Sequence, residues 1–432
     1  MQLVAYGAQD IYLTGNPQIT FFKVVYRRHT NFAVESIEQT FNGTANFGTR
    51  VTATISRNGD LIQQMYLEVV LPVPTGMANA EWTYGVGNAL VKQAEIEIGG
   101  QLIDRQYGDW MNIWSELTIP AGKRDGYDNM VGNTVTGGTD QLGAIAIASA
   151  PRLYVPLQFW FNRNPGLALP LIALQYHEVK LNLELRPLGD LLQAGDSSGS
   201  TAVGSLSTCK LYVDYVYLDT DERRRFAQVS HEYLIEQVQF TGTQTINANS
   251  PNQNVTLNFN HPVKELIWAH TSSIRATPFV FAGDGSKSST GSWFNYSAAA
   301  NAATGIDSFN TALLQLNGHD RFSVRYSDYF RKVQNYEHHT RVPRVGEDAG
   351  LHTDTCRKAL RQYIYSYSFA LSPEEHQPSG TCNFSRIDNA VLQLTYSAAA
   401  ETYNQSLNLN IYAVNYNVLR IMSGMGGLAY SN

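Results

Sequence analysis

The side chains that could hold a metal ion gather in one stretch of this sequence, where adjacent His338 and His339 precede His352 and Cys356. Imidazole and thiolate are ligands that Zn²⁺ prefers, and His352 and Cys356 stand four residues apart. No second cysteine pair stands at a fixed spacing, and the stretch has the composition of a loop. We therefore interpret it as a solvated loop and expect no metal site.

The sequence also gives no good evidence for a site of acid–base catalysis. The sequence has no phosphate-binding loop and no His-Glu-x-x-His motif. His376 follows Glu374 and Glu375, but three polar residues just before a proline are more typical of a turn surface than of a general acid and base. His177 and Glu178, at the start of a strand pattern, have the same interpretation. We expect no enzymatic activity and no cofactor.

The charge balance disfavours direct binding of nucleic acid. The formal net charge is −6 and the pI about 5.9, so a broad positive field is missing. Arg27 and Arg28 form one basic pair, and residues 223–225 form an arginine triplet. Asp219, Asp221 and Glu222 precede the triplet, which favours a self-neutralising linker or a subunit contact.

Tryptophans could supply a platform for sugar rings. Trp160 and Trp268 lie in strand patterns and are expected in the core, while Trp293 stands in a Ser/Gly-rich loop. Trp293 is therefore the tryptophan to test as an exposed one.

Five sequons for N-glycosylation are present, but the start of the chain lacks a basic leader followed by an apolar segment. The sequence predicts neither a signal peptide nor a membrane anchor, and three widely spaced cysteines favour a reducing compartment of synthesis. The sequon asparagines are Asn42, Asn254, Asn295, Asn383 and Asn404.

Length and composition predict two β-rich domains. The chain of 432 residues is longer than a domain with a single hydrophobic core usually is. Of its residues 43% are hydrophobic and only 16% are charged. Apolar and polar residues alternate in many short runs, as in residues 179–185, which is the period of a half-buried strand. Eight runs lie near 35–41, 50–56, 64–71, 93–98, 101–106, 152–161, 178–186 and 210–218. Eight more lie near 234–241, 254–260, 263–270, 312–317, 320–325, 361–370, 389–396 and 407–414.

The two sets of runs repeat in order, which indicates an internal duplication. A Gly-Gly turn at residues 99–100 precedes Tyr107, and an Asn-Gly turn precedes Tyr326 about 218 residues later. In each half an aspartate, Asp109 or Asp328, is the expected N-cap of a short helix, at Trp110–Leu117 or Tyr329–Tyr336. Eight strands with a few long insertions fit a jelly roll, so we predict an all-β double jelly roll of two eight-stranded antiparallel sandwiches in tandem.

Several long motifs resemble the major capsid proteins of nucleocytoplasmic large DNA viruses, chlorella-virus and other phycodnavirus members above all. They span both halves of the chain. The matching segments are residues 2–10, 13–23, 26–28, 55–61, 165–179, 231–237, 377–389 and 415–427.

The resemblance implies a subunit that forms homotrimers, each a capsomer of pseudo-hexagonal outline because three subunits supply six similar barrels. Such capsomers would tile an icosahedral shell above an internal membrane, with minor capsid proteins as further partners. The implied location is the capsid of the virion, assembled in the host cytoplasm.

An N-terminal arm, residues 1–26, would pack beneath the barrels toward the particle interior. Phe21, Phe22 and Tyr26 are its candidate contacts, because exposed aromatic side chains after Pro17 suit an extended docking segment. The first jelly roll is expected at residues 27–213, a linker at 214–225 and the second jelly roll at 226–432.

Members from chlorella viruses carry glycans on outward loops of the second barrel, by a route that need not use the usual sequon. By loop position, Asn295, Asn301 and Asn404 are the candidate glycosylation sites here.

The leading interpretation is a structural major capsid protein. A minor or special-position capsid paralogue is an alternative within assembly. A carbohydrate-binding jelly-roll protein is an alternative from another class, because lectins share this architecture.

Overall fold

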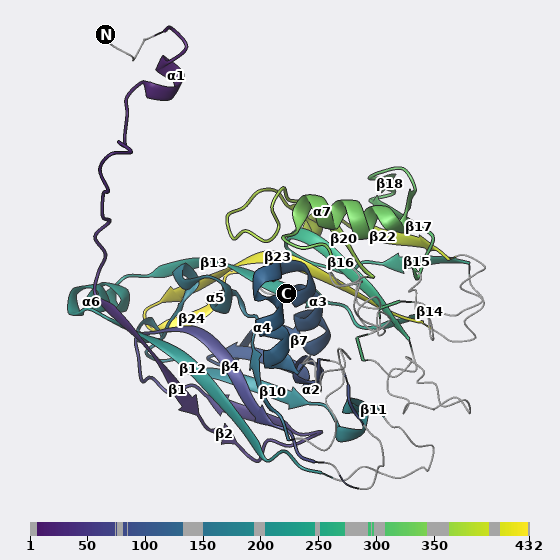
Figure 1. Cartoon of the computed structure of the whole chain (residues 1–432), viewed down its shortest axis with the longest axis horizontal. Helices are drawn as coiled ribbons and strands as arrows, with labels where there is room; N and C mark the ends of the chain where they lie inside the picture. The colour runs from purple at the N-terminus through teal and green to yellow at the C-terminus, as the bar shows by residue number, and fades with distance from the viewer. Residues whose placement is uncertain are drawn as a thin grey trace.

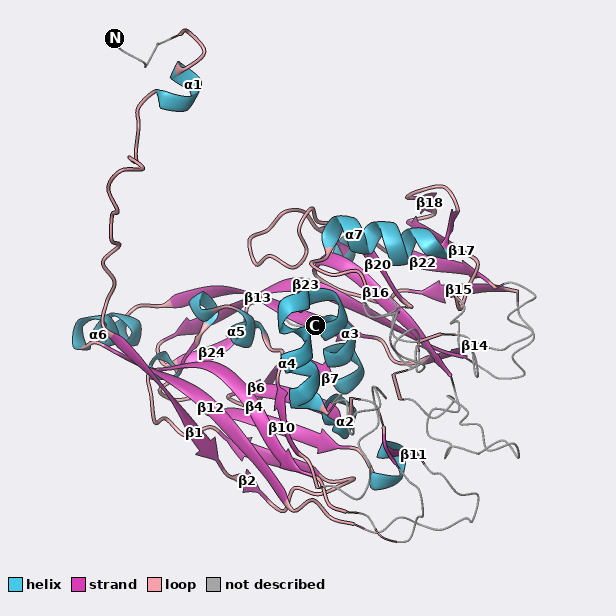
Figure 2. Ribbon diagram, viewed as in Figure 1, coloured by secondary structure: helices cyan, strands magenta, loops and turns pink. Residues whose placement is uncertain are grey.

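The computed structural model of the chain describes residues 7–73, 75, 81–83, 85–132, 150–193, 204–246, 251–272, 293–294, 296–297, 307–343, 363–396 and 407–430. Strands dominate both halves of the chain (Figure 2). No helix in this part of the chain is long and apolar enough to cross a membrane.

The N-terminal half folds into two facing antiparallel sheets. One sheet has the order β1-β12-β4-β8, with β9 beside β4, and the other has the order β2-β3-β10-β6-β7. The strands of the first sheet are β1 (Phe32–Gln39), β4 (Leu61–Val70), β8 (Arg152–Pro156), β9 (Leu169–Pro170) and β12 (Thr208–Leu218). Those of the second are β2 (Phe41–Asn42), β3 (Arg50–Thr54), β6 (Val91–Ile98), β7 (Gln101–Tyr107) and β10 (Val179–Leu185).

The C-terminal half repeats this plan. One sheet has the order β13-β23-β16-β20, with β14, β21 and β24 at its margins, and the other has the order β15-β22-β17-β18, with β19 beside β17. The strands of the first are β13 (His231–Phe240), β14 (Gln244–Ile246), β16 (Pro262–Ser272), β20 (Ile364–Ser368), β21 (Cys382–Asn383), β23 (Leu407–Met422) and β24 (Met425–Leu428). Those of the second are β15 (Asn252–Thr256), β17 (Thr311–Leu316), β18 (His319–Asp320), β19 (Arg325–Tyr326) and β22 (Ala390–Thr395).

The strand orders of the two halves correspond one to one. In each half the first long strand pairs with the last, which pairs with the third, and the second strand pairs with the seventh. This is the topology of a jelly roll, so the predicted double jelly roll is confirmed (Figure 1). The duplication seen in the sequence is thus a duplication of a folding unit.

Alternating burial explains most strands. Along β10 the valine and the leucines are buried, while Lys180, Asn182 and Glu184 are half-buried on the other face. Trp160 and Trp268 are buried in the core, as expected. In β16 the alternation disappears, and every residue from Val263 to Thr271 is buried. This strand is therefore covered on both faces.

Short helices fill the connections. They are α1 (Ile11–Thr14), α2 (Val86–Leu90), α3 (Gly108–Thr118), α4 (Ala121–Val131), α5 (Trp160–Arg163), α6 (Thr220–Gln228), a π-helical turn at Tyr329–Val333 and α7 (Gln334–His338). β5 (Glu81–Trp82) and β11 (Leu192–Gln193) form a separate two-stranded antiparallel ribbon. 3₁₀ turns occupy Pro165–Leu167, Leu171–Ala173, Leu188–Leu191 and Phe384–Arg386.

The two expected helices are present, but Asp109 is not the N-cap of the first, and Asp328 stands at the N-cap position of the second without making a side-chain capping bond. Residue 107 precedes the first turn of α3, and Asp109 lies inside that turn, where its carboxylate accepts a hydrogen bond from the indole of Trp293 at 2.8 Å. Asp328 has helical backbone angles and makes no capping bond, and its carboxylate pairs with Arg331 at 2.6 Å instead. Both aspartates are engaged by side chains rather than by free backbone N–H groups.

Two predicted strands end differently. The strand expected at 152–161 stops at Pro156, and residues 160–163 form α5, because consecutive Trp160 and Phe161 are both buried and a strand would turn one of them outward. The strand expected at 320–325 is two short pieces, β18 and β19, after the tight turn at Asn317 and Gly318, where both residues have positive φ.

The seam between the jelly rolls begins later than expected. Residues 214–218 of the expected linker belong to β12, and the charged run after them forms the exposed helix α6. Asp219 caps this helix by accepting a hydrogen bond from the backbone N–H of Thr220. Arg223 reaches back to the buried carboxylate of Asp60 at 2.9 Å, so α6 is tied to the first jelly roll.

Candidate functional site

Aromatic side chains from both halves pack together where the jelly rolls meet. Tyr107, at the end of β7, lies 5.0 Å from the ring of Phe240, and Phe240 stacks on Tyr412 at 4.8 Å. Trp110 of α3 adds a ring 5.3 Å from Tyr412. Aromatic pairs contribute about 0.5–1.5 kcal/mol each beyond their buried area. This cluster holds α3 and β7 against the second jelly roll.

Beside the aromatic cluster lies a buried network of charges. Glu236 of β13 pairs with Lys264 of β16 at 2.9 Å and with Arg163 of the first jelly roll at 3.2 Å. Its carboxylate also lies 3.4 Å from His376. Burial raises the pKa of Glu236, but the contacts with His376, Arg163 and Lys264 outweigh it and hold the pKa at about 2. The carboxylate is therefore the shared anion between the two halves.

Two edge strands are bridged by side chains next to this network. Gln237 of β13 donates a hydrogen bond to the backbone carbonyl of Ile103 in β7, and the N–H of Val238 donates to Asp104 at 3.2 Å. Burial raises the pKa of Asp104 to about 6, although the hydrogen bond from the N–H of Val238 favours its charged form. Side chains thus satisfy backbone groups that a continuous sheet would have paired.

Helix α3 makes a second polar junction. Glu116 is buried and pairs with Arg124 at 2.6 Å and with Arg341 of the second jelly roll at 3.4 Å. Asn112, two positions from both Trp110 and Trp114, donates a hydrogen bond to the hydroxyl of Tyr296 at 2.9 Å. Helix α3 thus contributes polar contacts as well as an aromatic contact to the junction between the two jelly rolls.

Trp293 is not the exposed platform that its loop composition predicted. Its indole N–H is held by Asp109, and the guanidinium of Arg186 lies 4.1 Å above its ring. The ring of this second-half residue is therefore docked on the first jelly roll.

The histidines behave differently from expectation. His339 is buried between Glu265, at 3.1 Å, and Glu374, at 2.9 Å, so this part of the expected solvated loop is packed. The expected turn is present at residues 373–374, but Glu374 and His376 are only partly exposed, and they contact His339 and Glu236. His352 and Cys356 lie outside the described residues. Within those residues no group of three or more metal-binding side chains is found.

The protonation of His339 should make stability depend on alkaline pH. Burial lowers the pKa of His339, but Glu265 and Glu374 outweigh it and raise the pKa to about 9. A raised histidine pKa stabilises the fold fully below 6.5, and the stabilisation is lost as the pH rises through 9. Thermal unfolding midpoints should fall across this window, and less in His339→Gln. The same substitution at exposed His319 should leave the slope unchanged, and equal slopes for all three proteins would contradict the assignment.

His177 is also more than turn surface. Its Nδ1 lies 3.0 Å from the carbonyl oxygen and 3.2 Å from the N–H of Gly426, in the hairpin that joins β23 to β24. A Cβ at Gly424 would approach the ring of Tyr176 to 2.6 Å, and Gly424 has φ +80°, so a side chain there meets both a clash and strain. The C-terminal hairpin thus straps the second jelly roll to the first.

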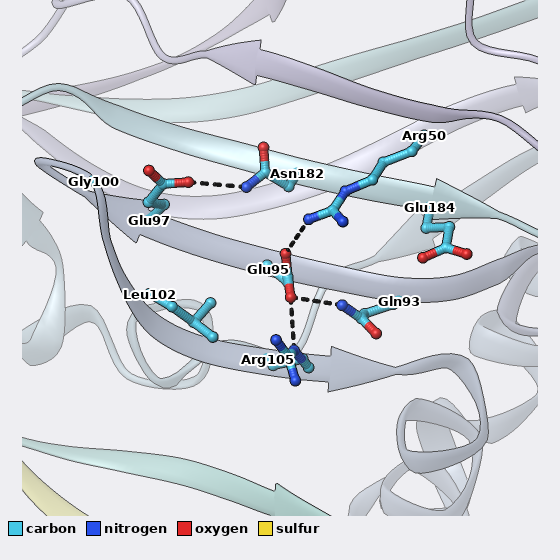
Figure 3. A pocket seen from close by; sticks show the side chains of 9 residues that line it. All are labelled: Arg50, Gln93, Glu95, Glu97, Gly100, Leu102, Arg105, Asn182 and Glu184. Carbon is cyan, nitrogen blue, oxygen red and sulfur yellow. Dashed lines mark hydrogen bonds and ion pairs between the residues drawn. The ribbon is translucent and has the colours of Figure 1, made fainter. Parts of the chain in front are cut away.

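The second sheet of the first jelly roll carries a polar pocket of about 430 Å³ (Figure 3). Glu95 lies at its centre and accepts hydrogen bonds from Arg50, Arg105 and Gln93. Glu97 accepts from Asn182 at 3.0 Å, and the third carboxylate of the pocket, on β10, pairs with a lysine. Each carboxylate is thus already committed to a partner, which suits a charge-balanced contact surface rather than an acid–base pair.

The N-terminal arm stands away from the body of the protein (Figure 1). The exposed fractions are 90% for Phe21, 99% for Phe22 and 85% for Tyr26. Arg27 and Arg28 are exposed as well. The three aromatic residues are thus free to meet a partner, and their role as contacts stays a prediction.

The candidate glycosylation residues Asn295, Asn301 and Asn404 all lie outside the described residues. Asn42 and Asn254 are exposed on short strands. The side chain of Asn383 caps a 3₁₀ turn by accepting a hydrogen bond from the N–H of Ser385 at 3.1 Å.

The fold and the junction define the class as a double jelly-roll viral capsid protein. The PBCV-1 virus capsid structure matches with a TM-score of 0.75 and 42% identity, over 96% of this chain and 100% of that chain. The Faustovirus major capsid protein has a TM-score of 0.73 at 13% identity, over 96% and 94%, which supports the fold alone.

Sequence relatives narrow the class to one family. The major capsid protein of Pyramimonas orientalis virus is 54% identical, over 100% of this chain and 99% of that protein. The one from Paramecium bursaria Chlorella virus 1 is 45% identical over the same shares. The family profile "Major capsid protein N-terminus" matches residues 20–219, and "Large eukaryotic DNA virus major capsid protein" matches residues 222–353 and 354–427. The chain belongs to the major capsid proteins of large eukaryotic DNA viruses and is a structural component of the virion capsid.

Proposed function

We propose that three copies of this chain associate into a homotrimeric capsomer of pseudo-hexagonal outline, and that such capsomers tile an icosahedral shell. The observation that carries the proposal is the junction between the two jelly rolls. Buried ion pairs, an aromatic cluster and the C-terminal strap join two barrels of like topology into one unit. Three such units supply six similar barrels, and a closed threefold ring needs only heterologous contacts.

The same proposal assigns roles to the parts of the chain. Residues 1–26 are the arm, and the two jelly rolls meet at the seam between β12 and β13, at residues 219–230. Minor capsid proteins and an internal membrane beneath the shell are the further partners, and assembly takes place in the host cytoplasm. Loops of the second jelly roll carry glycans at Asn295, Asn301 or Asn404. Burial of surface between copies performs the function, without catalysis.

Native mass spectrometry of the purified protein tests the capsomer. We expect a stable species of three chains, because a permanent assembly buries enough surface to persist on dilution. Deletion of residues 1–26 should leave this species intact and impair only shell assembly, since the described part of the arm, residues 7–26, is exposed along almost its whole length. A monomer that binds oligosaccharide at micromolar affinity would overturn the proposal in favour of a lectin.

A further inference from the structure

The outer edge of β1 is open. Among the described strands β1 pairs with β12 alone, in an unbroken register from Phe32 opposite Leu218 to Gln39 opposite Leu211. The other edge of this eight-residue strand therefore offers a row of backbone N–H and C=O groups. Phe32 and Val34 are 59% and 50% exposed. A long edge strand with exposed apolar residues favours pairing with another strand, and proteins usually cover it.

The arm contains a segment with the properties of a missing strand. Residues Phe21–Arg28 also number eight, contain no proline or glycine, and are rich in aromatic and β-branched residues, which favour strands. Their apolar side chains have no cover, and Val24 and Val25 are each 73% exposed. The segment thus has apolar surface to bury and backbone groups to pair.

The charges of the two elements are complementary. Lys23, Arg27 and Arg28 are the charged residues of the arm segment, and no acidic residue stands between Asp10 and Glu35. The charged residues of β1 are the acidic Glu35 and Glu38. Although the carboxylate of Glu38 pairs with Lys210 at 2.8 Å, its side chain is 41% exposed and can accept a second cation.

The path of the chain indicates that the strand added to β1 comes from a second copy of the chain. Residues 27–31 form no turn, and the arm runs away from β1 in Figure 1. Pairing with its own β1 would need a hairpin turn at residues 29–31, and the structure has no turn there. Fully extended, the eleven residue steps from Phe21 to Phe32 span about 36 Å, at roughly 3.3 Å per residue, which is far enough to meet a subunit that lies against β1.

We propose that residues Phe21–Arg28 of one copy add as a β-strand to the free edge of β1 in a copy that belongs to a neighbouring capsomer, with the basic side chains of the arm facing Glu35 and Glu38. This inference rests on the proposed capsomer and names the partner of its arm. Strand addition supplies main-chain hydrogen bonds, and the flanking charges select the partner. The arm of each subunit then covers the exposed edge of another.

Cysteine cross-linking between separately purified variants tests the pairing. Val24→Cys and Val25→Cys place a thiol on either face of the arm strand, and Val34→Cys places one on β1. Each arm variant is mixed with the β1 variant and treated with a bis-maleimide. We expect at least a tenfold higher yield of the two-chain product than with Leu371→Cys, an equally simple change at a site that is 77% exposed. A yield equal to this control overturns the proposal.

The double variant Val25→Cys/Val34→Cys separates the two possible owners of the strand. A cross-link that forms only within one chain overturns the second-copy assignment. Native mass spectrometry of every variant distinguishes the failure of one proposal from the failure of the other. A three-chain species that gives no cross-link would contradict only the strand addition. Loss of the three-chain species would contradict the capsomer.

Hydrogen exchange supplies a measurement that needs no substitution. In the intact chain, amides of Phe32–Gln39 that face the open edge should exchange at least tenfold more slowly at high than at low protein concentration. In the chain that lacks residues 1–26, exchange should not depend on concentration. Exchange in the intact chain that does not depend on concentration would refute the pairing. If the arm itself became protected from exchange only when anionic vesicles were added, its partner would be a membrane and the strand addition would be refuted.

Discussion

Replacing Glu236 by alanine is expected to lower the free energy of unfolding by about 3–5 kcal/mol, because it leaves buried cations without their shared anion. The side chain of Lys264 is 1% exposed and that of Arg163 is 18% exposed, and both pair with the Glu236 carboxylate. The loss is measured as the shift of the urea midpoint followed by tryptophan fluorescence. Since the anion joins both halves, the variant should also yield less of the assembled species.

Glu232 provides the matched control on the same strand. It pairs with Arg420 at 2.8 Å, but the two side chains are 60% and 50% exposed. An exposed pair contributes at most about 1 kcal/mol, so Glu232→Ala should change the midpoint little. In the double variant Glu236→Ala/Lys264→Met, part of the lost stability should return, because one uncompensated cation is removed. Equal effects of the two single alanine substitutions would contradict the assignment.

The pH dependence of this network has a definite sign. A carboxylate with a lowered pKa stabilises the fold above its ordinary pKa of 4.5, and the stabilisation is lost as the pH falls through about 2. Asp104 acts in the opposite direction, because its pKa is raised to about 6 and its protonation on acidification relieves the cost of burial. The two groups together therefore favour mildly acidic solution, between about pH 4.5 and pH 6, for the junction.

The strands could be predicted because each sheet buries one face. Alternation of apolar and polar residues marks that face without any knowledge of the partner strand, and the order of turns revealed the repeat. The end of the strand at 152–161 could not be predicted in the same way. There the side chain of Asn162 accepts a hydrogen bond from the N–H of Phe159 at 3.1 Å, at the start of α5. The helix forms because two adjacent aromatic residues are both buried in the tertiary structure, which the local sequence does not reveal.

The polar junction could not be predicted, because the pattern of apolar and polar residues shows which side chains are buried but not which residues they pair with. Arg163, Glu236 and Lys264 belong to separate parts of the chain, and the fold alone brings them together. A signal was present at residues 263–270. Lys264 and Glu265 stand in an otherwise apolar run, and such a run without alternation is typical of a strand that is covered on both faces.

Helix α3 owes its position to Gly108, and Gly108→Ala is expected to lower the free energy of unfolding by about 3 kcal/mol or more. A Cβ at this residue would lie 2.2 Å from the carbonyl oxygens of both Asn88 and Val91. These are backbone atoms of α2 and β6, so no side chain can move aside to relieve the contact. The shift of the denaturation midpoint measures the effect.

Gly126 of α4 supplies the opposite case. It is exposed, lies inside a helix, and a Cβ there meets nothing within 4 Å. Gly126→Ala should therefore stabilise the protein by about 0.5–1 kcal/mol, because alanine restricts the unfolded chain and favours the helix. If both substitutions changed stability equally, close packing of α3 on α2 and β6 would not be the cause.

The loss in Gly108→Ala should extend beyond the first jelly roll. Displacing α3 would move Glu116 away from Arg341 and Trp110 away from Tyr412, which are contacts with the second jelly roll. Native mass spectrometry should then show fewer three-chain species at a denaturant concentration that leaves Gly126→Ala assembled. A variant that loses stability but keeps full assembly would show instead that α3 supports the first barrel alone, and that the charged network and the C-terminal strap suffice to hold the two barrels together.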